Sequence, residues 1–453
     1  MNPNLINFIY LVAAILFILG IKGLTKPKTA VRGNMLSALG MLVAVVVTLI
    51  NINDVDFTYV IAGVIVGGII GGVMALKVQM TSMPQMVALL NGFGGGASLT
   101  IALAEYATRV GMAPSSLANF FDPVVVSSNA FGDGLVGTIA ILSIGLTVLI
   151  GAVTLTGSLV AFGKLQELIK KSRGLPGGPI GNGLMLAGAL FSVYLLVNNP
   201  GDVAAMGAIL SLALLLGLFL VMPIGGADMP VVIALLNSYS GIAAALAGFI
   251  LGNTVLIVAG SLVGTSGLIL TQIMCVAMNR SLANVLFGKM AAGGEEIDAD
   301  EIYAGKVKSA QPDEVAMMLE TAQRVVIVPG FGMAMAQAQH AVRELANALE
   351  KNGTEVEYGI HPVAGRMPGH MNVLLAEAEV PYDKLVEMDR INPTFEDTDV
   401  VIVIGANDVT NPMARDSEGS PIYGMPILNV DKAKNVVVIK RSLSPGFAGL
   451  PNP

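Results

Sequence analysis

Long apolar runs, separated by short polar connections, occupy the first part of the chain, up to about residue 280. Nine of these runs approach the ~20 residues that a membrane-spanning helix needs. They begin near Leu5, Met35, Phe57, Met83, Leu135, Gly183, Val203, Met229 and Asn253. Between positions 174 and 279 the only charged residues are Asp202 and Asp228, although four runs lie there. The pattern predicts a polytopic α-helical membrane bundle of nine transmembrane helices over residues 1–288.

A different pattern begins after Arg280. Residues 289–320 are acidic and predict a solvated linker that turns helical near Pro312. From Arg324 onward, short β-branched runs alternate with a helical stretch at about residues 333–351. The predicted strands are residues 325–328, 355–360, 400–404 and 436–439. Because such alternation is typical of βαβ units in a parallel sheet, we expect an α/β Rossmann-like domain over residues 321–453.

Charges in the connections predict the orientation of the bundle. Lys and Arg gather after the first, third, fifth and ninth runs, as Lys22, Lys26, Lys28, Arg32, Lys77, Lys164, Lys170, Lys171, Arg173, Arg280 and Lys289. The alternate connections carry Asp54, Asp56 and Asp202, with Arg109 as an exception. The positive-inside rule then places the N-terminus outside and the C-terminal domain in the cytoplasm. No Lys or Arg precedes the first run, so we expect a retained helix rather than a signal peptide.

Composition supports a protein in the lipid bilayer and argues against other classes. Hydrophobic residues make up 54% of the chain and charged residues only 13%, against about 25% in soluble domains. The net charge of -7 gives no electrostatic footprint for nucleic acid. Cys275 is the single cysteine, which rules out a disulfide framework within the chain. His361 and His370 lack clustered Cys or carboxylate neighbours in the sequence, so no metal site is predicted.

Two membrane segments form an internal repeat. A Met-Pro pair leads through the same apolar register to Asn91 in one segment and to Asn237 in the other. Repeats are common in transporters, whose coupling sites lie near the membrane midplane at the repeat interface. An intramembrane amide either lines a pathway or hydrogen-bonds across a helix interface, and both interpretations stay open. Asp228, directly before the second Met-Pro pair, is a candidate N-cap.

The clearest chemical signal follows the first predicted strand. That strand runs into Gly330-Phe331-Gly332 and then into a helix, the context of a dinucleotide fingerprint. Gly330 permits the tight turn, Gly332 lets a pyrophosphate approach the backbone, and the helix N-terminus offers N–H groups to the anion. Met335 stands where the fingerprint usually has its last Gly. An ordinary strand–helix turn is the alternative.

The ends of the other strands favour NADP over NAD. An NAD site usually has an acid after the second strand to hold the ribose 2′-hydroxyl, but here that strand ends in His361-Pro362. Lys440-Arg441-Ser442 follow the last predicted strand and suit a 2′-phosphate, which Arg can bind bidentately. A solvated strand end is the competing interpretation.

Two further loops are candidates for cofactor contact. Residues 365–370 form a Gly- and Pro-rich loop with one arginine, Arg366, suited to clamp a pyrophosphate or to serve as a plain surface loop. Residues 405–408, Gly-Ala-Asn-Asp, end another strand at the edge where ligands bind in open α/β folds. Asp408 either caps this turn or faces the cofactor.

At this point the residues resemble a known family, the β subunit of bacterial proton-translocating NAD(P)+ transhydrogenase, over nearly the whole chain. The motifs that carry the resemblance are GGADMP at 225–230, LNSYSG at 236–241, MNRS at 278–281, VPGFGMA at 328–334, HPVAGRMPGHMNV at 361–373 and GAND at 405–408. The resemblance implies one subunit of an oxidoreductase and translocase in the bacterial inner membrane. NADP(H) would bind this chain, and a separate α subunit would carry the NAD(H) domain, in a dimer of αβ units. Hydride transfer between NADH and NADP+ would be coupled to proton movement.

The resemblance also assigns roles residue by residue. Arg366 would bind the pyrophosphate, Lys440 and Arg441 the 2′-phosphate, and Asp408 with Asn407 would lie near the nicotinamide as catalytic or coupling residues. The full cofactor-binding set is Gly330, Gly332, Met333, Ala334, His361, Gly365, Arg366, Gly405, Asn407, Asp408, Lys440, Arg441, Ser442 and Phe447. The proton path or its cytoplasmic mouth would include Asn91, Asn237 and Asp228.

The chain departs from the family pattern in three places. Many relatives have a titratable His where this chain has Asn91, and an amide carries no proton at neutral pH. Phe447 stands where many relatives have Tyr. The NADP(H) domain is also expected to be short at its C-terminus relative to the family. The alternative function is a nucleotide-sensing transporter or channel with a regulatory Rossmann domain, although the chain has no Thr-Val-Gly-Tyr-Gly filter sequence.

Overall fold

The computed structural model describes residues 3–24, 27–51, 57–111, 134–169, 178–225, 228–287, 308–367, 369–418, 420, 422–441, 450 and 452. The chain divides into two compact units. The first comprises residues 1–78, 85–223 and 234–269, and the second comprises residues 79–84, 224–233 and 270–453. The predicted cofactor residues Ser442 and Phe447 and most of the acidic linker lie outside the described residues.

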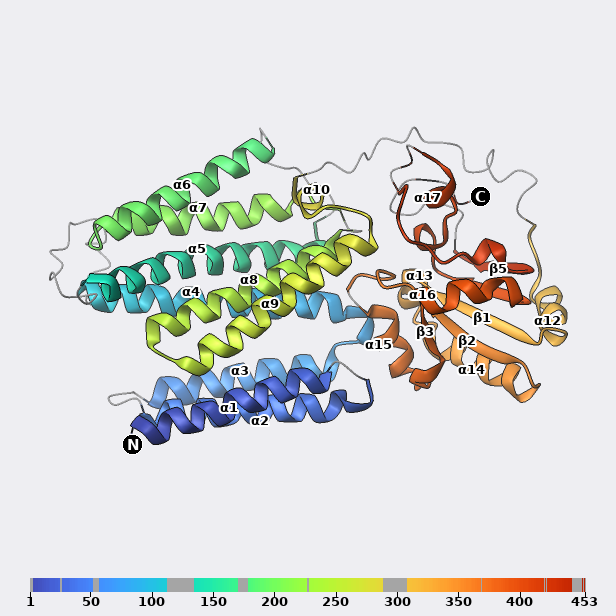
Figure 1. Cartoon of the computed structure of the whole chain (residues 1–453), viewed down its shortest axis with the longest axis horizontal. Coiled ribbons are helices and arrows are strands. Elements are labelled where there is room, and N and C mark those ends of the chain that lie inside the picture. The colour runs from blue at the N-terminus through green and yellow to red at the C-terminus, as the bar shows by residue number, and fades with distance from the viewer. Residues whose placement is uncertain are drawn as a thin grey trace. The chain divides into compact units, whose positions relative to one another are not determined.

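Within the described ranges, nine helices are long and apolar enough to cross a membrane, as predicted. They are α1 (Pro3–Leu24), α2 (Pro27–Asn51), α3 (Phe57–Lys77), α4 (Met83–Val110), α5 (Gly134–Leu165), α6 (Pro179–Asn198), α7 (Val203–Val221), α8 (Met229–Leu251) and α9 (Thr254–Ala277) (Figure 1). The runs are helical because an apolar environment offers no partners for backbone polar groups, which a helix satisfies internally. A short helix, α10 (Leu282–Phe287), follows α9.

The internal repeat is reproduced in the helix boundaries. Helices α4 and α8 begin at Met83 and Met229, so Asn91 and Asn237 each lie about two turns inside. The helices approach each other one turn further on, where a Cβ added to Gly94 would lie 2.3 Å from the Oγ of Ser240. Residues three positions apart share a helix face, so both asparagines lie on the sides of α4 and α8 that meet.

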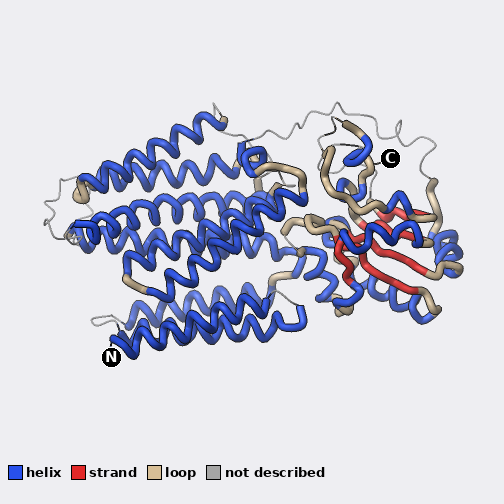
Figure 2. The backbone as a smooth tube through the Cα atoms, in the orientation of Figure 1, coloured by secondary structure: helices blue, strands red, loops and turns tan. Residues whose placement is uncertain are grey.

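The second unit contains a five-stranded parallel sheet, shown as the red segments of Figure 2. Its strands are β1 (Arg324–Pro329), β2 (Glu355–Ile360), β3 (Leu385–Glu387), β4 (Val400–Ile404) and β5 (Asn435–Ile439), in the order β3-β2-β1-β4-β5. Within the described residues, this order matches the first five strands of a Rossmann sheet. The sequence prediction missed β3 because three residues make no recognisable alternating run.

Helices cover both faces of the sheet. They are α12 (Pro312–Glu320), α13 (Phe331–Met335), α14 (Gln339–Lys351), α15 (His370–Glu377) and α16 (Met388–Ile391). Helix α17 (Met413–Asp416) packs instead in a separate small core with Ile422 and Ile427. Alternate residues of β1 enter different cores: Val325 and Ile327 belong to one, Val326 and Val328 to the other, and all four are fully buried. A strand buried on both faces reads as an unbroken apolar run, as this one does.

The predicted continuous helix over residues 333–351 is wrong. It is interrupted after Met335, and Gln337 has a left-handed φ of 50° between α13 and α14. The N–H of Ala338 turns back to the carbonyl of Met333, which closes the short helix α13. Helix α14 is therefore a separate helix and not the one that begins at the fingerprint glycines.

One carboxylate holds the amino-terminal edge of the sheet. Asp399, just before β4, accepts the N–H groups of Gln323 and Arg324 at 2.9 and 3.0 Å. Its other oxygen accepts the Nζ of Lys434 at 2.8 Å. The Lys434 contact and then the two backbone N–H groups lower the pKa of the Asp399 carboxyl. This residue joins the starts of β1, β4 and β5.

Candidate functional site

The carboxyl ends of all five strands meet at one edge because the sheet is parallel. The chain passes from β1 to β2 on one side and returns to β4 on the other, so the strand order reverses between β1 and β4. Ligands of open α/β folds bind outside the strand ends at such a reversal. The loops that follow β1, β2, β4 and β5, which hold the predicted cofactor residues, therefore converge there.

Glycines lock the loops after β1 and β4 together. The N–H of Gly330 donates to the Ile404 carbonyl, and that of Gly332 donates to the Gly405 carbonyl, both at 2.9 Å. A Cβ on Gly330 would lie 2.4 Å from the Cα of Ala406, and one on Gly332 would lie 2.6 Å from the Cα of Gly405. Gly405 also has a φ of +67°. The Gly332 N–H that the fingerprint interpretation reserved for an anion is thus engaged within the protein.

The first turn after the fingerprint is a packing element. Met333 and Ala334 are buried in the core, so their side chains face away from solvent. Helix α13 has five residues and cannot provide the dipole of a long helix. The glycine loop therefore mainly allows close approach of a ligand to the backbone, and a helix dipole contributes less to anion binding there.

Asp408 and Lys440 come together from different strands. Asp408 begins a 3₁₀ turn after β4, and Lys440 follows β5; both are half-buried. Burial lowers the pKa of the Lys440 ammonium, and the nearby Asp408 carboxylate partly offsets this. The carbonyl of Asn407 accepts the Nδ2 of Asn452 at 3.0 Å. Arg441 is exposed beside Lys440. The fold thus places two cations and a carboxylate at the same sheet edge.

His361 is held inside the domain. Its Nε2 donates to the carbonyl of Pro426 at 2.8 Å, and its Nδ1 accepts the N–H of Val363 at 3.2 Å. Burial lowers the pKa of this imidazole to about 4, so the neutral form that can both donate and accept prevails. The His361 ring attaches the loop after β2 to the segment at Pro426. His361, which was predicted to contact the cofactor, therefore lies buried behind that loop.

The same loop carries Arg366, whose guanidinium lies over the ring of Phe331. The imidazole of His370 is fully buried beneath them. Gly365 has a φ of +113° and touches that imidazole so closely that no side chain fits. This loop, predicted as a pyrophosphate clamp, follows β2 at the carboxyl edge of the sheet.

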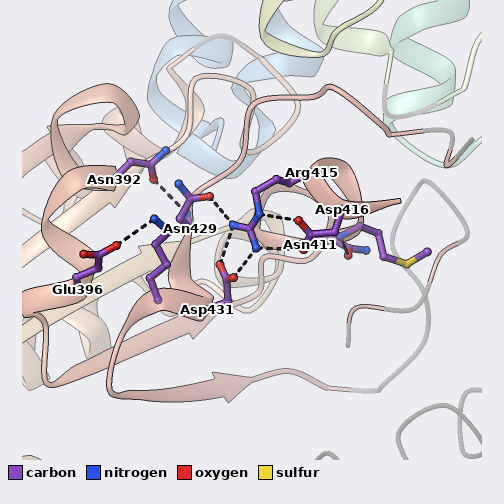
Figure 3. Close-up of polar contacts among 9 residues, drawn as sticks. Asn392, Glu396, Asn411, Arg415, Asp416, Asn429 and Asp431 are labelled. Carbon is purple, nitrogen blue, oxygen red and sulfur yellow. Dashed lines mark hydrogen bonds and ion pairs between the residues drawn. The ribbon is translucent and has the colours of Figure 1, made fainter. Parts of the chain in front are cut away.

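A polar network that sequence reasoning missed secures the long segment after β4. Figure 3 shows Arg415 between Asp416 and Asp431, with Arg415 Nε 2.9 Å from Asp416 Oδ1 and Nη2 2.7 Å from Asp431 Oδ2. Asn429 accepts a further N–H of Arg415 at 3.1 Å. These residues lie within positions 415–431 but match none of the motifs that the sequence suggested. Because they lie at the surface, we assign them a structural role.

In the membrane half, Asp228 forms an ion pair. Both of its carboxylate oxygens accept from Arg280 Nη1, at 3.0 and 2.8 Å. The carbonyl of Asp228 accepts the N–H groups of Val231 and Val232 and so starts α8, while its side chain serves the pair. In the sequence, Arg280 stood among the connection charges and in the MNRS motif, and nothing there indicated Asp228 as its partner. Asn91 is buried and Asn237 is partly buried.

No group of three or more His, Cys, Asp or Glu side chains that could hold a metal ion occurs in the described ranges.

Comparison with known proteins agrees with this architecture. The family model described as NAD(P) transhydrogenase beta subunit matches residues 6–453. Two proteins named NAD(P) transhydrogenase subunit beta, both from Rhodospirillum rubrum, are similar to the chain. Each is 45% identical over 462 residues, covering 100% of this chain and 94% of the relative. With a membrane-length helical half and a Rossmann-type sheet already established, the chain belongs to the NAD(P) transhydrogenase beta subunit family.

Proposed function

We propose that this chain binds NADP(H) at the carboxyl edge of its sheet and couples hydride transfer between NADH and NADP+ to proton movement through its helical half. The observation that carries the proposal is one polypeptide whose described residues form a 3-2-1-4-5 parallel sheet and nine membrane-length helices. The family supports a transhydrogenase subunit.

The edge residues fit a dinucleotide with an extra phosphate. Lys440 and Arg441 follow β5, and a desolvated ammonium at this position favours a multiply charged anion over water. The end of β2 carries a buried His361 instead of the acid that would hold an NAD ribose. Arg366 would contact the pyrophosphate, and glycines 330, 332 and 405 would let the ligand approach the backbone.

Hydride transfer needs alignment of two nicotinamides and exclusion of water. When bound, NADP(H) would supply the nicotinamide that gives or accepts the hydride. Asn407 and Asp408 would orient the nicotinamide ring, and the loop after β4 would transmit whether that ring is oxidised or reduced. The NAD(H) domain would come from an α subunit, in a dimer of αβ units. The bundle would lie in a bacterial inner membrane, with the N-terminus outside and the sheet domain in the cytoplasm.

Proton movement would pass the crossing of α4 and α8. Asn91 and Asn237 lie on the facing sides of these helices, and Asp228 begins α8. An amide can hydrogen-bond a water chain without titrating, so Asn91 and Asn237 would orient water. The Asp228–Arg280 pair would form the charged mouth of the path.

The test measures nucleotide binding to the full chain in detergent, with NADPH fluorescence as the signal. We expect NADPH to bind and NADH to bind at least tenfold more weakly. Exchanging Lys440 and Arg441 together for Ala should remove that preference. Lys432→Ala is the matched control, because this exposed lysine pairs only with Glu396 at the surface.

Equal binding of both nucleotides, or no binding by a folded chain, would overturn the assignment. NADPH binding without NADH-dependent hydride exchange, once the α subunit is supplied, would favour the nucleotide-sensing transporter instead.

A further inference from the structure

The loops after β1 and β2 are joined by a cation on an aromatic ring. Phe331 is the middle residue between the two fingerprint glycines, and Arg366 belongs to the loop after β2. The guanidinium carbon of Arg366 lies 4.1 Å from the centroid of the Phe331 ring. This distance is well inside the ~6 Å range of cation–π attraction. The side chain of Arg366 thus rests on a residue from another loop.

The main chain of Arg366 is held as well. Its N–H donates to Nδ1 of His370 at 3.0 Å. His370 is fully buried, and its ring centroid lies 6.3 Å from that of Phe331. Gly365 wraps the same imidazole, since a Cβ there would lie 2.5 Å from His370 Nδ1. Arg366 is therefore held at both ends: the Phe331 ring contacts its guanidinium, and the His370 imidazole binds its backbone N–H.

We propose that Phe331 and His370 are positioning residues that hold Arg366 ready to bind the pyrophosphate of the dinucleotide. This inference rests on the proposed function, because it assigns to Arg366 the contact suggested there. It adds two residues with defined tasks. The sequence had treated Phe331 as the variable position of the fingerprint and His370 as the end of a loop.

The chemistry of arginine explains why stacking suits this task. A guanidinium attracts an aromatic ring through its flat face, whereas its N–H groups donate in its plane. A stacked arginine can therefore bind a phosphate through its edge without leaving the ring. A free arginine loses side-chain rotamer entropy when it is immobilised. Stacking in the ligand-free protein removes part of that cost before binding.

His370 can accept the Arg366 N–H only while Nδ1 carries no proton. Burial, and then the charge of Arg366, lower the pKa of this imidazole to about 4. The acceptor form is thus the one present at neutral pH. A protonated ring would offer two donors and would face the Arg366 cation, so the same contacts would become repulsive.

Affinity for NADPH, measured by fluorescence titration of the full chain in detergent, tests the role of Phe331. Phe331→Leu should weaken binding about 3- to 30-fold, the range expected for one cation–π contact. Phe331→Tyr keeps the ring and should stay within about twofold. Tyr382→Leu removes another partly exposed aromatic residue and should change nothing.

A double-mutant cycle separates positioning from mere packing. With Arg366→Ala as background, Phe331→Leu should have no further effect on NADPH affinity, because the ring then has nothing to position. An equal loss in both backgrounds would overturn the inference. So would an unchanged affinity of Phe331→Leu while Arg366→Ala alone binds weakly. If Arg366→Ala binds NADPH normally, the proposed role of Arg366 itself fails.

The role of His370 is tested with a pair of variants. His370→Asn keeps an acceptor near Nδ1 and should retain most of the affinity, whereas His370→Leu should lose about tenfold or more. If His370→Leu does not fold, the asparagine variant still decides. Folded His370→Asn with NADPH affinity as low as that of Arg366→Ala would contradict an acceptor role.

Discussion

The Asp228–Arg280 pair offers the sharpest test of how the second unit is held together. The Asp228 side chain is 5% exposed and that of Arg280 is 20% exposed. Exchanging Asp228 for Asn keeps the shape but removes the negative charge, whose two carboxylate oxygens both accept from Arg280 Nη1. The perturbation therefore leaves a largely buried guanidinium without a carboxylate.

Removal of one partner from a buried ion pair costs about 3–5 kcal/mol. We take the lower end, about 3 kcal/mol, because Arg280 keeps some contact with solvent. With about 1.4 kcal/mol for each factor of ten, local opening around the pair should become about 100-fold more frequent. The Asp228→Leu/Arg280→Met double variant replaces both charges by apolar groups and should recover most of this loss.

Cys275 provides the assay. It is the only cysteine of the chain, it is 7% exposed, and its carbonyl accepts the N–H of Arg280 at 2.9 Å. A fluorogenic maleimide added to the full chain in detergent will react when this end of α9 opens. The labelling rate of Cys275 should rise about 100-fold in Asp228→Asn, at a reagent concentration where the rate follows the opening equilibrium.

The matched control is Asp202→Asn. Asp202 caps α7 by accepting the Ala205 N–H at 2.9 Å, and asparagine caps equally well. Its labelling rate should stay within about threefold of the parent. If Asp228→Asn behaves like this control, or if the double variant labels as fast as the single one, the pair does not hold α9 and the reasoning is refuted.

Three further predictions concern the sheet domain. Gly330→Ala would put a Cβ 2.4 Å from the Ala406 Cα. We expect the free energy of unfolding to fall by roughly 2 kcal/mol or more and NADPH binding to be lost as well, as measured by thermal unfolding and by titration. Asp399→Ala orphans two backbone N–H groups and a lysine and should cost about 2–3 kcal/mol, seen as faster limited proteolysis. The pKa values of His361 and His370 fall from 6.5 to about 4 on folding, so between these values the unfolded chain binds more protons. Stability should therefore be full above pH 6.5 and fall by about 3 kcal/mol per histidine toward pH 4, measured by denaturant unfolding at each pH; a flat profile would contradict the burial of both rings.

The local sequence pattern was sufficient to predict the membrane helices and most of the strands. The nine helices were predicted because backbone groups in lipid must be satisfied within the segment, so apolar length alone specifies them. Strands β1 and β4 were predicted because buried parallel strands read as β-branched runs. The mostly exposed strand β5 carries a similar β-branched run, which also allowed its prediction. The positions of Asn91 and Asn237 also followed, since a repeated sequence starts its helix at the repeated Met-Pro pair.

Local pattern failed where conformation depended on distant contacts. Strand β3 is three residues long and exists through its pairing with β2. The break between α13 and α14 requires Gln337 to adopt a left-handed φ, which no residue type there announces. The side chain of Asp228 was predicted as a cap and instead binds Arg280, 52 residues away.

By itself, the sequence determined the fold class, the family motifs and the loops that approach one edge of the sheet, because these follow from hydrophobic periodicity and from glycines at strand ends. Only the tertiary structure decided what the individual side chains do there. It turned His361 inward, engaged the Gly332 N–H with Gly405, and stacked Arg366 on Phe331. The physical reason is that hydrogen bonds, stacking and desolvation depend on distances of a few ångströms between residues far apart in the chain, and a linear pattern does not contain those distances.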